Sequence, residues 1–238
     1  MAMVTLVAGT PARSAVPSTT DQPKPIWHPS PNFGPRRDGL RPTLIVLHYT
    51  AMENASAALD RLCDPAPEVS AHYLIGRDGT LWQLVREEDR AWHAGAGEWH
   101  GQMDVNSRSV GIELDNRGDH PFSEPQMRAL EQLLPNIMRR WAISPEGVIG
   151  HSDMAPGRKI DPGPRFDWQR LEHQDLAAPR GTTAQTDLNF RALAKSRGYT
   201  AAVDDDTLLH TTRLRYRPWA IGPIHPDDLM VLCQSPKT

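Results

Sequence analysis

Cysteine is nearly absent from this chain of 238 residues, which contains only Cys63 and Cys233. Two cysteines so far apart in sequence do not form a disulfide framework or a cysteine-based zinc cluster, so we expect free thiols, with a single disulfide as the alternative. Long apolar runs are missing too, because no stretch approaches the roughly 18 to 20 apolar residues of a membrane-spanning helix. We therefore expect a globular protein without a membrane span.

Runs of basic residues are also missing, since no five lysines or arginines are consecutive and the formal net charge is -3. Such a chain has no general electrostatic attraction to nucleic acid or to anionic lipid, so neither is expected as a partner. The short apolar run near the N-terminus has no basic residue ahead of it and is interrupted by Pro11 and Arg13. We therefore do not expect it to act as a secretory signal.

Three regions follow from the composition and periodicity of the chain. Residues 1–25 are rich in Ala, Ser, Thr and Pro and are predicted to form a mobile arm. Residues 26–178 alternate between strand-like and helix-like segments, which predicts an α/β or α+β domain with a central sheet. Residues 185–235 contain three short helical patterns and predict a small all-α C-terminal domain.

Within the central region, four segments have the apolar pattern of strands: Thr43–Thr50, which contains His48; Ala71–Val85, a hairpin around Asp78-Gly79; Ser109–Asn116, which contains Glu113; and Gly147–His151. Asp-Gly dipeptides favour the positive φ angles of a two-residue hairpin turn. Two helices are predicted, one over Ala55–Cys63 and one that starts at a capping box of Ser123 and Gln126 and continues to Trp141.

Two histidines and one acid stand out from this pattern. His48 and His151 each close an apolar strand, and Asp161 lies ten residues beyond His151 in the loop GHSDMAPGRKIDPG, which prolines and glycines stiffen. Imidazole nitrogens and a carboxylate oxygen are good ligands for Zn²⁺, and three protein ligands leave a fourth position open for catalysis. Spacing alone leaves a second interpretation open, in which each histidine is a partly exposed polar residue.

Five blocks in order, LIVLHYT, SAHYLIGRDGTLWQLV, RAWHAG, NSRSVGIELDN and GHSDMAPGRKIDPG, closely resemble the type 2 N-acetylmuramoyl-L-alanine amidases. The resemblance covers about residues 26–178. It implies a mixed central β-sheet flanked by helices, and Zn²⁺ bound by His48, His151 and Asp161. It also implies that Glu113 is the catalytic glutamate and that Lys159 stabilises the oxyanion. The alternatives are a solvated strand face for Glu113 and an ion pair with Asp161 or Asp153 for Lys159.

The same resemblance suggests residues that contact the substrate: Tyr49, Trp92, His93, Asn106 and Arg108. For Trp92 and His93 the alternative is ordinary packing in the core. His72 is interpreted as a core histidine or a residue that supports a ligand. The C-terminal helices faintly resemble a small peptidoglycan-binding domain, and a packing appendage is the alternative.

These features predict a zinc-dependent enzyme that hydrolyses the amide bond between N-acetylmuramic acid, including its 1,6-anhydro form, and L-alanine of the peptidoglycan stem peptide. The expected partners are peptidoglycan fragments and anhydro-muropeptides, and the expected state is a monomer. A non-catalytic peptidoglycan recognition module is the alternative function. We expect a cytoplasmic location, where the enzyme would act in cell-wall recycling; a periplasmic or outer-membrane location is the alternative.

Overall fold

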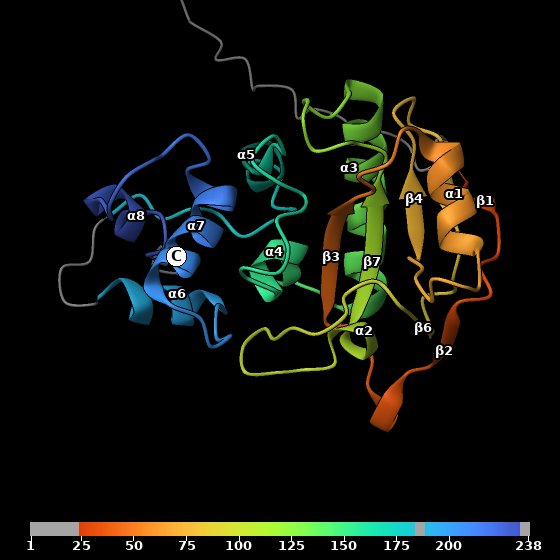
Figure 1. Ribbon diagram of the computed structural model, residues 1–238, viewed down its shortest axis with the longest axis horizontal. Coiled ribbons are helices and arrows are strands. Elements are labelled where there is room, and N and C mark those ends of the chain that lie inside the picture. Colours follow the sequence, from red (N-terminus) through yellow and green to blue (C-terminus); the bar gives the residue numbers. More distant parts are fainter. Residues whose placement is uncertain (1–23, 184–188, 234–238) are drawn as a thin grey trace, which may run out of the picture.

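A mixed six-stranded β-sheet forms the centre of the computed structural model, which describes residues 24–183 and 189–233 (Figure 1). The strand order is β1-β5-β4-β7-β3-β8. β3 pairs in parallel with β7 and with β8, whereas β4 and β5 form an antiparallel hairpin. The bounds are β1 (Ile26–Trp27), β3 (Leu44–Tyr49), β4 (Tyr73–Ile75), β5 (Leu81–Gln83), β7 (Ser109–Leu114) and β8 (Val148–Gly150). The predicted α/β class with a mixed central sheet is confirmed.

Helices cover both faces of this sheet. α3 lies along one face, and α4 lies between the sheet and the C-terminal helices α6, α7 and α8 (Figure 1). The helix bounds are α1 (Ala55–Cys63), α2 (Val105–Arg108), α3 (Glu124–Trp141), α4 (His151–Met154), α5 (Trp168–Glu172), α6 (Phe190–Arg197), α7 (Asp205–Tyr216) and α8 (Pro226–Met230). Two 3-10 turns (Arg37–Gly39 and Pro145–Gly147) and a second sheet of β2 (Phe33–Pro35) and β6 (Asp89–Ala91) complete the described fold.

The alternation of side chains along β3 decides what each face of the sheet contacts. Ile45 and Leu47 point into the hydrophobic cluster that α3 covers. Val46 points to the other face, where a second cluster includes residues of α4, α6 and α7. His48 follows Val46 on that second face, at the carboxyl end of the strand. A polar residue therefore continues an apolar row at the point where the strand leaves the core.

The predicted elements are present, with three local corrections. The hairpin loop contains three residues, Arg77–Gly79, rather than two, because Gly76 and Thr80 are hydrogen-bonded and only Gly79 in this loop has positive φ. Ser123 caps α3, but the predicted capping box does not form because the side chain of Gln126 is buried and donates to Ile75 O instead. His151 is the first residue of α4 rather than the last of a strand.

The three predicted C-terminal helices are α6, α7 and α8, and Gly198 is the C-cap of α6. They share a continuous hydrophobic cluster with the sheet and α4, in which Leu193 and Leu208 are buried together with Val46 and Ile149. Their division from the rest of the chain as a separate domain stays a prediction. The predicted N-terminal arm lies outside the described residues, apart from residues 24 and 25.

Two expectations from composition can be compared with the described residues. In the part of the chain that the structure describes, Cys63 and Cys233 are both thiols and no disulfide joins them, as predicted. Within residues 24–183 and 189–233, no helix combines the length and apolar character needed to cross a bilayer.

Candidate functional site

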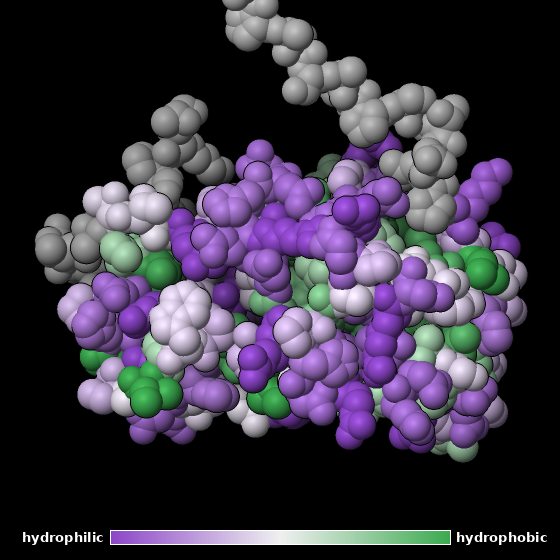
Figure 2. Space-filling view, turned by 90° about the horizontal axis from the view of Figure 1, so that it is seen from above, coloured by the Kyte–Doolittle hydropathy of each residue, from purple (hydrophilic) through white to green (hydrophobic). Residues whose placement is uncertain are grey.

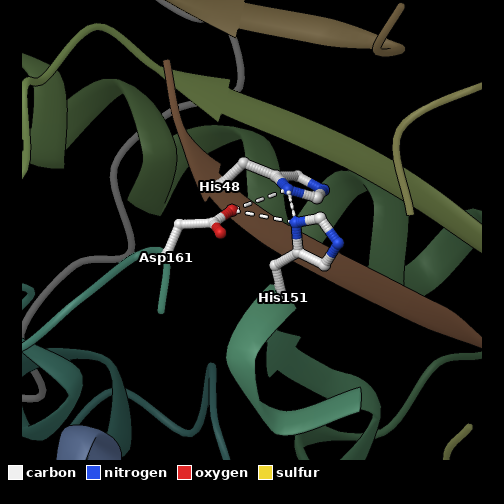
Figure 3. Close-up of side chains that lie close together, drawn as sticks. All are labelled: His48, His151 and Asp161. Carbon is white, nitrogen blue, oxygen red and sulfur yellow. Dashed lines mark hydrogen bonds and ion pairs between the residues drawn. The ribbon is translucent and has the colours of Figure 1, made fainter. Parts of the chain in front are cut away.

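His48, His151 and Asp161 meet at one point, although they come from three different elements (Figure 3). His48 lies on β3, His151 begins α4, and Asp161 lies on the loop after α4. The Nδ1 atoms of the two histidines are 2.9 Å apart, and each is 3.0 Å from Oδ2 of Asp161. All three side chains are buried. The three residues predicted as metal ligands therefore form a cluster that could hold a metal ion.

The sheet and a backbone contact place these three side chains. β3 and β8 are parallel neighbours, so their carboxyl ends bring His48 and the start of α4 to the same edge. The backbone N–H of Ser152 donates to the carbonyl of Asp161 at 2.9 Å, which ties the loop to the first turn of α4. The chain between His151 and Asp161 therefore folds back on itself, and the two residues lie side by side although they are ten positions apart.

The outer hydrogen bond of His151 determines which ring nitrogen faces the centre of the cluster. His151 Nε2 lies 2.8 Å from the carbonyl oxygen of Ala94, which can only accept a hydrogen bond. In the neutral imidazole Nε2 therefore carries the proton, and Nδ1 presents a lone pair to the cluster.

A longer chain of contacts determines the tautomer of His48. The hydroxyl of Ser109 donates to Val105 O at 2.6 Å, so its oxygen accepts from His93 Nε2 at 3.1 Å. Nδ1 of His93 then accepts from His48 Nε2 at 3.0 Å. This direction leaves the lone pair of His48 Nδ1 pointing at the cluster. Buried histidine ligands are commonly fixed in this way by the partner of their other nitrogen.

The pKa of His48 agrees with this set of electron-pair donors. Burial lowers the pKa of His48 to about 4, so its ring is neutral at pH 7. Two imidazole Nδ1 atoms and a carboxylate oxygen lie within 3.0 Å of one another, an arrangement that a bound cation stabilises.

Glu113 lies beside this cluster because β7 and β3 are in register at His48 and Glu113. Paired residues in neighbouring strands point to the same face of a sheet. Its Oε2 atom is buried and has no hydrogen-bond partner among the described residues. Burial, followed by the nearby charge of Asp161, raises the pKa of Glu113 to about 8. A carboxyl group with a raised pKa and a free oxygen beside a donor cluster is suited to proton transfer.

A cavity of about 600 Å³ opens onto the cluster. It is lined by His48, His151 and Asp161, by both predicted catalytic residues Glu113 and Lys159, by the predicted substrate contacts Tyr49, Trp92 and His93, and by residues of α1. Lys159 is exposed and forms no ion pair with Asp153 or Asp161. Its charge is therefore available to a molecule in the cavity.

This cavity lies at the carboxyl ends of the parallel strands. In Figure 1, β7 runs upward from α2, so these strand ends point toward the viewer of Figure 2. The face shown in Figure 2 is mainly hydrophilic and has a recess with apolar atoms at its floor. An apolar floor with polar walls is typical of sites that bind small organic molecules.

Two predicted substrate contacts lie elsewhere in the structure. Asn106 is buried, and its Oδ1 accepts from the backbone N–H groups of His93 and Ala94 at 3.0 and 2.8 Å. Arg108 donates to the carbonyl of Met103 at 3.1 Å. Neither residue lines the cavity. The side chain of Asn106 faces the backbone of this segment rather than solvent, so it supports the segment that carries His93.

Sequence reasoning missed several residues that support the site. Ser109 orients His93, and Arg158 donates to the carbonyl of Ala94 at 2.7 Å. Arg215, from α7, pairs with Asp153 at 2.9 Å. The block NSRSVGIELDN contains Ser109, so inward-facing polar residues in predicted strands are the signal that could have found it. No local signal marks Arg215. His72 accepts from the N–H of Gly111 and does not contact the cluster.

Comparison with known proteins agrees with this geometry. AmiD of Escherichia coli is 41% identical to this chain over an alignment that covers 57% of this chain and 54% of AmiD. AmpD of Haemophilus influenzae is 35% identical over an alignment that covers 59% of this chain and 86% of AmpD. The alignment with AmiD therefore spans about half of the length of AmiD. The structure of AmiD with anhydro-N-acetylmuramic acid-L-Ala-D-gamma-Glu-L-Lys covers 81% of this chain and 87% of its own, with 32% identity and a TM-score of 0.72.

A further solved structure extends over the C-terminal helices. AmpDh3 from Pseudomonas aeruginosa, in complex with anhydromuramic pentapeptide, covers 94% of this chain and 96% of its own, with 29% identity and a TM-score of 0.73. The sequence pattern of the N-acetylmuramoyl-L-alanine amidase family matches residues 38–164. Since this match includes His48, His151 and Asp161 and extends over more than half of the residues, the chain belongs to the N-acetylmuramoyl-L-alanine amidase family.

Proposed function

We propose that this chain is a zinc amidase that hydrolyses the bond between N-acetylmuramic acid and L-alanine in peptidoglycan fragments. The observation that carries the proposal is the convergence of two imidazole Nδ1 atoms and a carboxylate oxygen within 3.0 Å of one another, with Glu113 on the same face. AmiD binds an anhydro-muramyl peptide in its solved structure, and this supports a substrate of the same class here.

The metal would be held by His48, His151 and Asp161. A set of two imidazoles and one carboxylate fits Zn²⁺ and is typical of catalytic rather than purely structural sites. When bound, zinc supplies a Lewis acid that polarises the scissile carbonyl and makes water more acidic. The unpartnered Oε2 of Glu113 supports the assignment of a polar reaction partner beside these ligands.

The residues around the cluster each have a separate role in amide hydrolysis. Glu113 takes the proton of the attacking water and passes it to the leaving nitrogen of L-alanine, which is a poor leaving group without it. Lys159 faces the same cavity and stabilises the negative charge that develops on the carbonyl oxygen. Tyr49 and Trp92 form walls of the cavity and orient the substrate.

A non-catalytic recognition module is the second candidate. A module of that kind needs the cavity but needs neither a complete donor set nor a carboxylate with a raised pKa. This chain has both features, which favours catalysis. Because one chain supplies all of these residues, we also propose that a monomer is the working unit, which light scattering of the purified protein would test.

The proposal is tested by mass spectrometry of the products from two substrates offered in parallel, an anhydro-muropeptide and an intact peptidoglycan sacculus. Zinc-loaded protein should release free stem peptide, and a chelator or the Asp161→Ala substitution should abolish the release. Release from the small substrate alone indicates a recycling enzyme, and release from both indicates a broader range. Folded, zinc-loaded protein that binds muropeptide and releases no peptide would contradict catalysis in favour of the recognition module.

A further inference from the structure

A buried polar network joins the C-terminal helices to the element that carries His151. The carboxylate of Asp153, in α4, accepts from the N–H of Gly150 at 2.8 Å, from the hydroxyl of Tyr199 at 2.7 Å and from Nη1 of Arg215 at 2.9 Å. Arg215 and Asp153 are 4% and 1% exposed. Removing one partner of an ion pair this deeply buried leaves an unpaired charge in the interior, which strongly destabilises the local structure.

Arg215 contacts more than the carboxylate. It donates to the carbonyl of Val148 at 3.2 Å, in β8, the strand that leads into α4. Its guanidinium also stacks over the ring of Trp168, 4.0 Å from the ring centre. Trp168 in turn lies against Gly150, where an added Cβ would be 3.3 Å from the indole. One arginine therefore holds the strand before the metal ligand and, through Asp153, the helix that contains it.

This network reaches two of the three metal ligands. His151 is the first residue of α4, between Gly150 and Asp153, whose mutual hydrogen bond fixes that turn. The next residue, Ser152, donates its backbone N–H to the carbonyl of Asp161. A displacement of α4 would therefore move the donor atoms of His151 and Asp161 together. Figure 1 shows α4 held between the sheet and the C-terminal helices.

We propose that Arg215 of α7 is a positioning residue for the metal site, which acts through Asp153 on His151 and Asp161. The C-terminal helices then serve the chemistry by completing the support of the ligands, whether or not they also contact glycan. The proposal rests on the metal site of the proposed function. Outer partners of metal ligands typically contribute about 10-fold to 100-fold to metal affinity.

The experiment compares the zinc affinity of three full-length proteins: wild type, Arg215→Met and Arg213→Met. Arg213 is a matched control, because it lies on the same helix, is also buried and pairs with Asp228 of α8 at 2.6 Å. Both substitutions remove a buried arginine and should lower stability. Only Arg215→Met should weaken the binding of Zn²⁺, by about 10-fold or more in competition with a chromophoric chelator. Only Arg215→Met should also change the visible spectrum of bound Co²⁺.

A milder pair of substitutions covers the case in which Arg215→Met does not fold. Tyr199→Phe removes one of the three donors to Asp153 and should weaken zinc binding by about threefold to tenfold. Tyr216→Phe, at another buried tyrosine beside Arg215, should leave it unchanged. Equal zinc affinity in wild type, Arg215→Met and Tyr199→Phe would overturn the positioning role alone. A wild-type protein that binds no zinc would overturn the proposed function as well.

Discussion

At the scale of single residues, the site depends on polar groups placed where strands leave the core. Glu113 illustrates this best, because it is paired in register with His48 and its buried Oε2 has no hydrogen-bond partner among the described residues. We expect Glu113→Gln to reduce turnover of an anhydro-muropeptide by about 100-fold to 10,000-fold, since the amide cannot accept the proton of water. Zinc affinity should stay at the wild-type level, and a parallel loss of zinc would assign Glu113 to the ligand set instead.

The raised pKa of Glu113 also predicts that the stability of the metal-free protein depends on pH. The folded state holds the proton up to about pH 8, whereas the ordinary value is 4.5. Between these values the folded state binds more protons than the unfolded chain, so stability falls as pH rises. Metal-free Glu113→Gln should therefore be more stable than wild type at pH 8, by about 2–4 kcal/mol, and equal to it near pH 4. Denaturant unfolding at both pH values measures this difference, and a gap independent of pH would contradict it.

His48, His151 and Glu113 could be predicted from the sequence because each closes or interrupts an apolar pattern, whereas Asp161 was marked by its place in a loop that prolines and glycines stiffen. The family blocks then assign the roles of all four residues. Asn106 and Arg108 are in the same blocks, yet neither lines the cavity. Sequence spacing does not encode whether a loop side chain points outward or supports the neighbouring backbone. The direction of the Ser109–His93–His48 contacts follows only from three-dimensional proximity.

At the scale of elements, β7 must approach the ring of His93 closely. A Cβ at Gly111 would lie 2.5 Å from that ring, whose two nitrogens are both engaged. We expect Gly111→Ala to displace His93, to destabilise the fold by about 1–3 kcal/mol and to weaken zinc binding. Thermal unfolding and chelator competition measure the two effects. Gly34→Ala is the control, because no atom of the described residues lies within 4 Å of its added Cβ.

Long elements were predictable from their apolar period, and the short strands β4, β5 and β8 were predicted from apolar runs beside a turn or a histidine. β3, β7 and α3 have six, six and 18 residues, and each shows its period in the sequence. β1, β2 and β6 have two or three residues, most of them at least partly exposed, so neither a period nor an apolar run marks them. The capping box is absent for a different reason. The side chain of Gln126 donates to the buried carbonyls of Ile75 and Asp115 rather than accepting from the start of its own helix.

At the scale of the whole molecule, the C-terminal helices are part of the same core as the sheet. The pairing of Arg215 with Asp153 joins residues 62 positions apart, a distance over which no sequence period applies. Leu193, Leu208 and Tyr216 are buried in one cluster with Ile149 and Met154. A packing role was one of the two alternatives at the level of sequence, and the shared cluster supports it without excluding contact with glycan.

This shared core predicts that a chain ending at residue 183 does not fold to the native state. Each large apolar side chain left exposed costs about 1.5–3 kcal/mol, and the cluster loses several at once, whereas a domain has only about 5–15 kcal/mol of net stability. Circular dichroism and a zinc titration of the two purified fragments, 24–183 and 184–238, measure the outcome. Neither should show a cooperative unfolding transition alone. A shortened chain that unfolds cooperatively and binds zinc as tightly as the full chain would show that the helices are a separate domain, and that Arg215 has no part in holding the ligands.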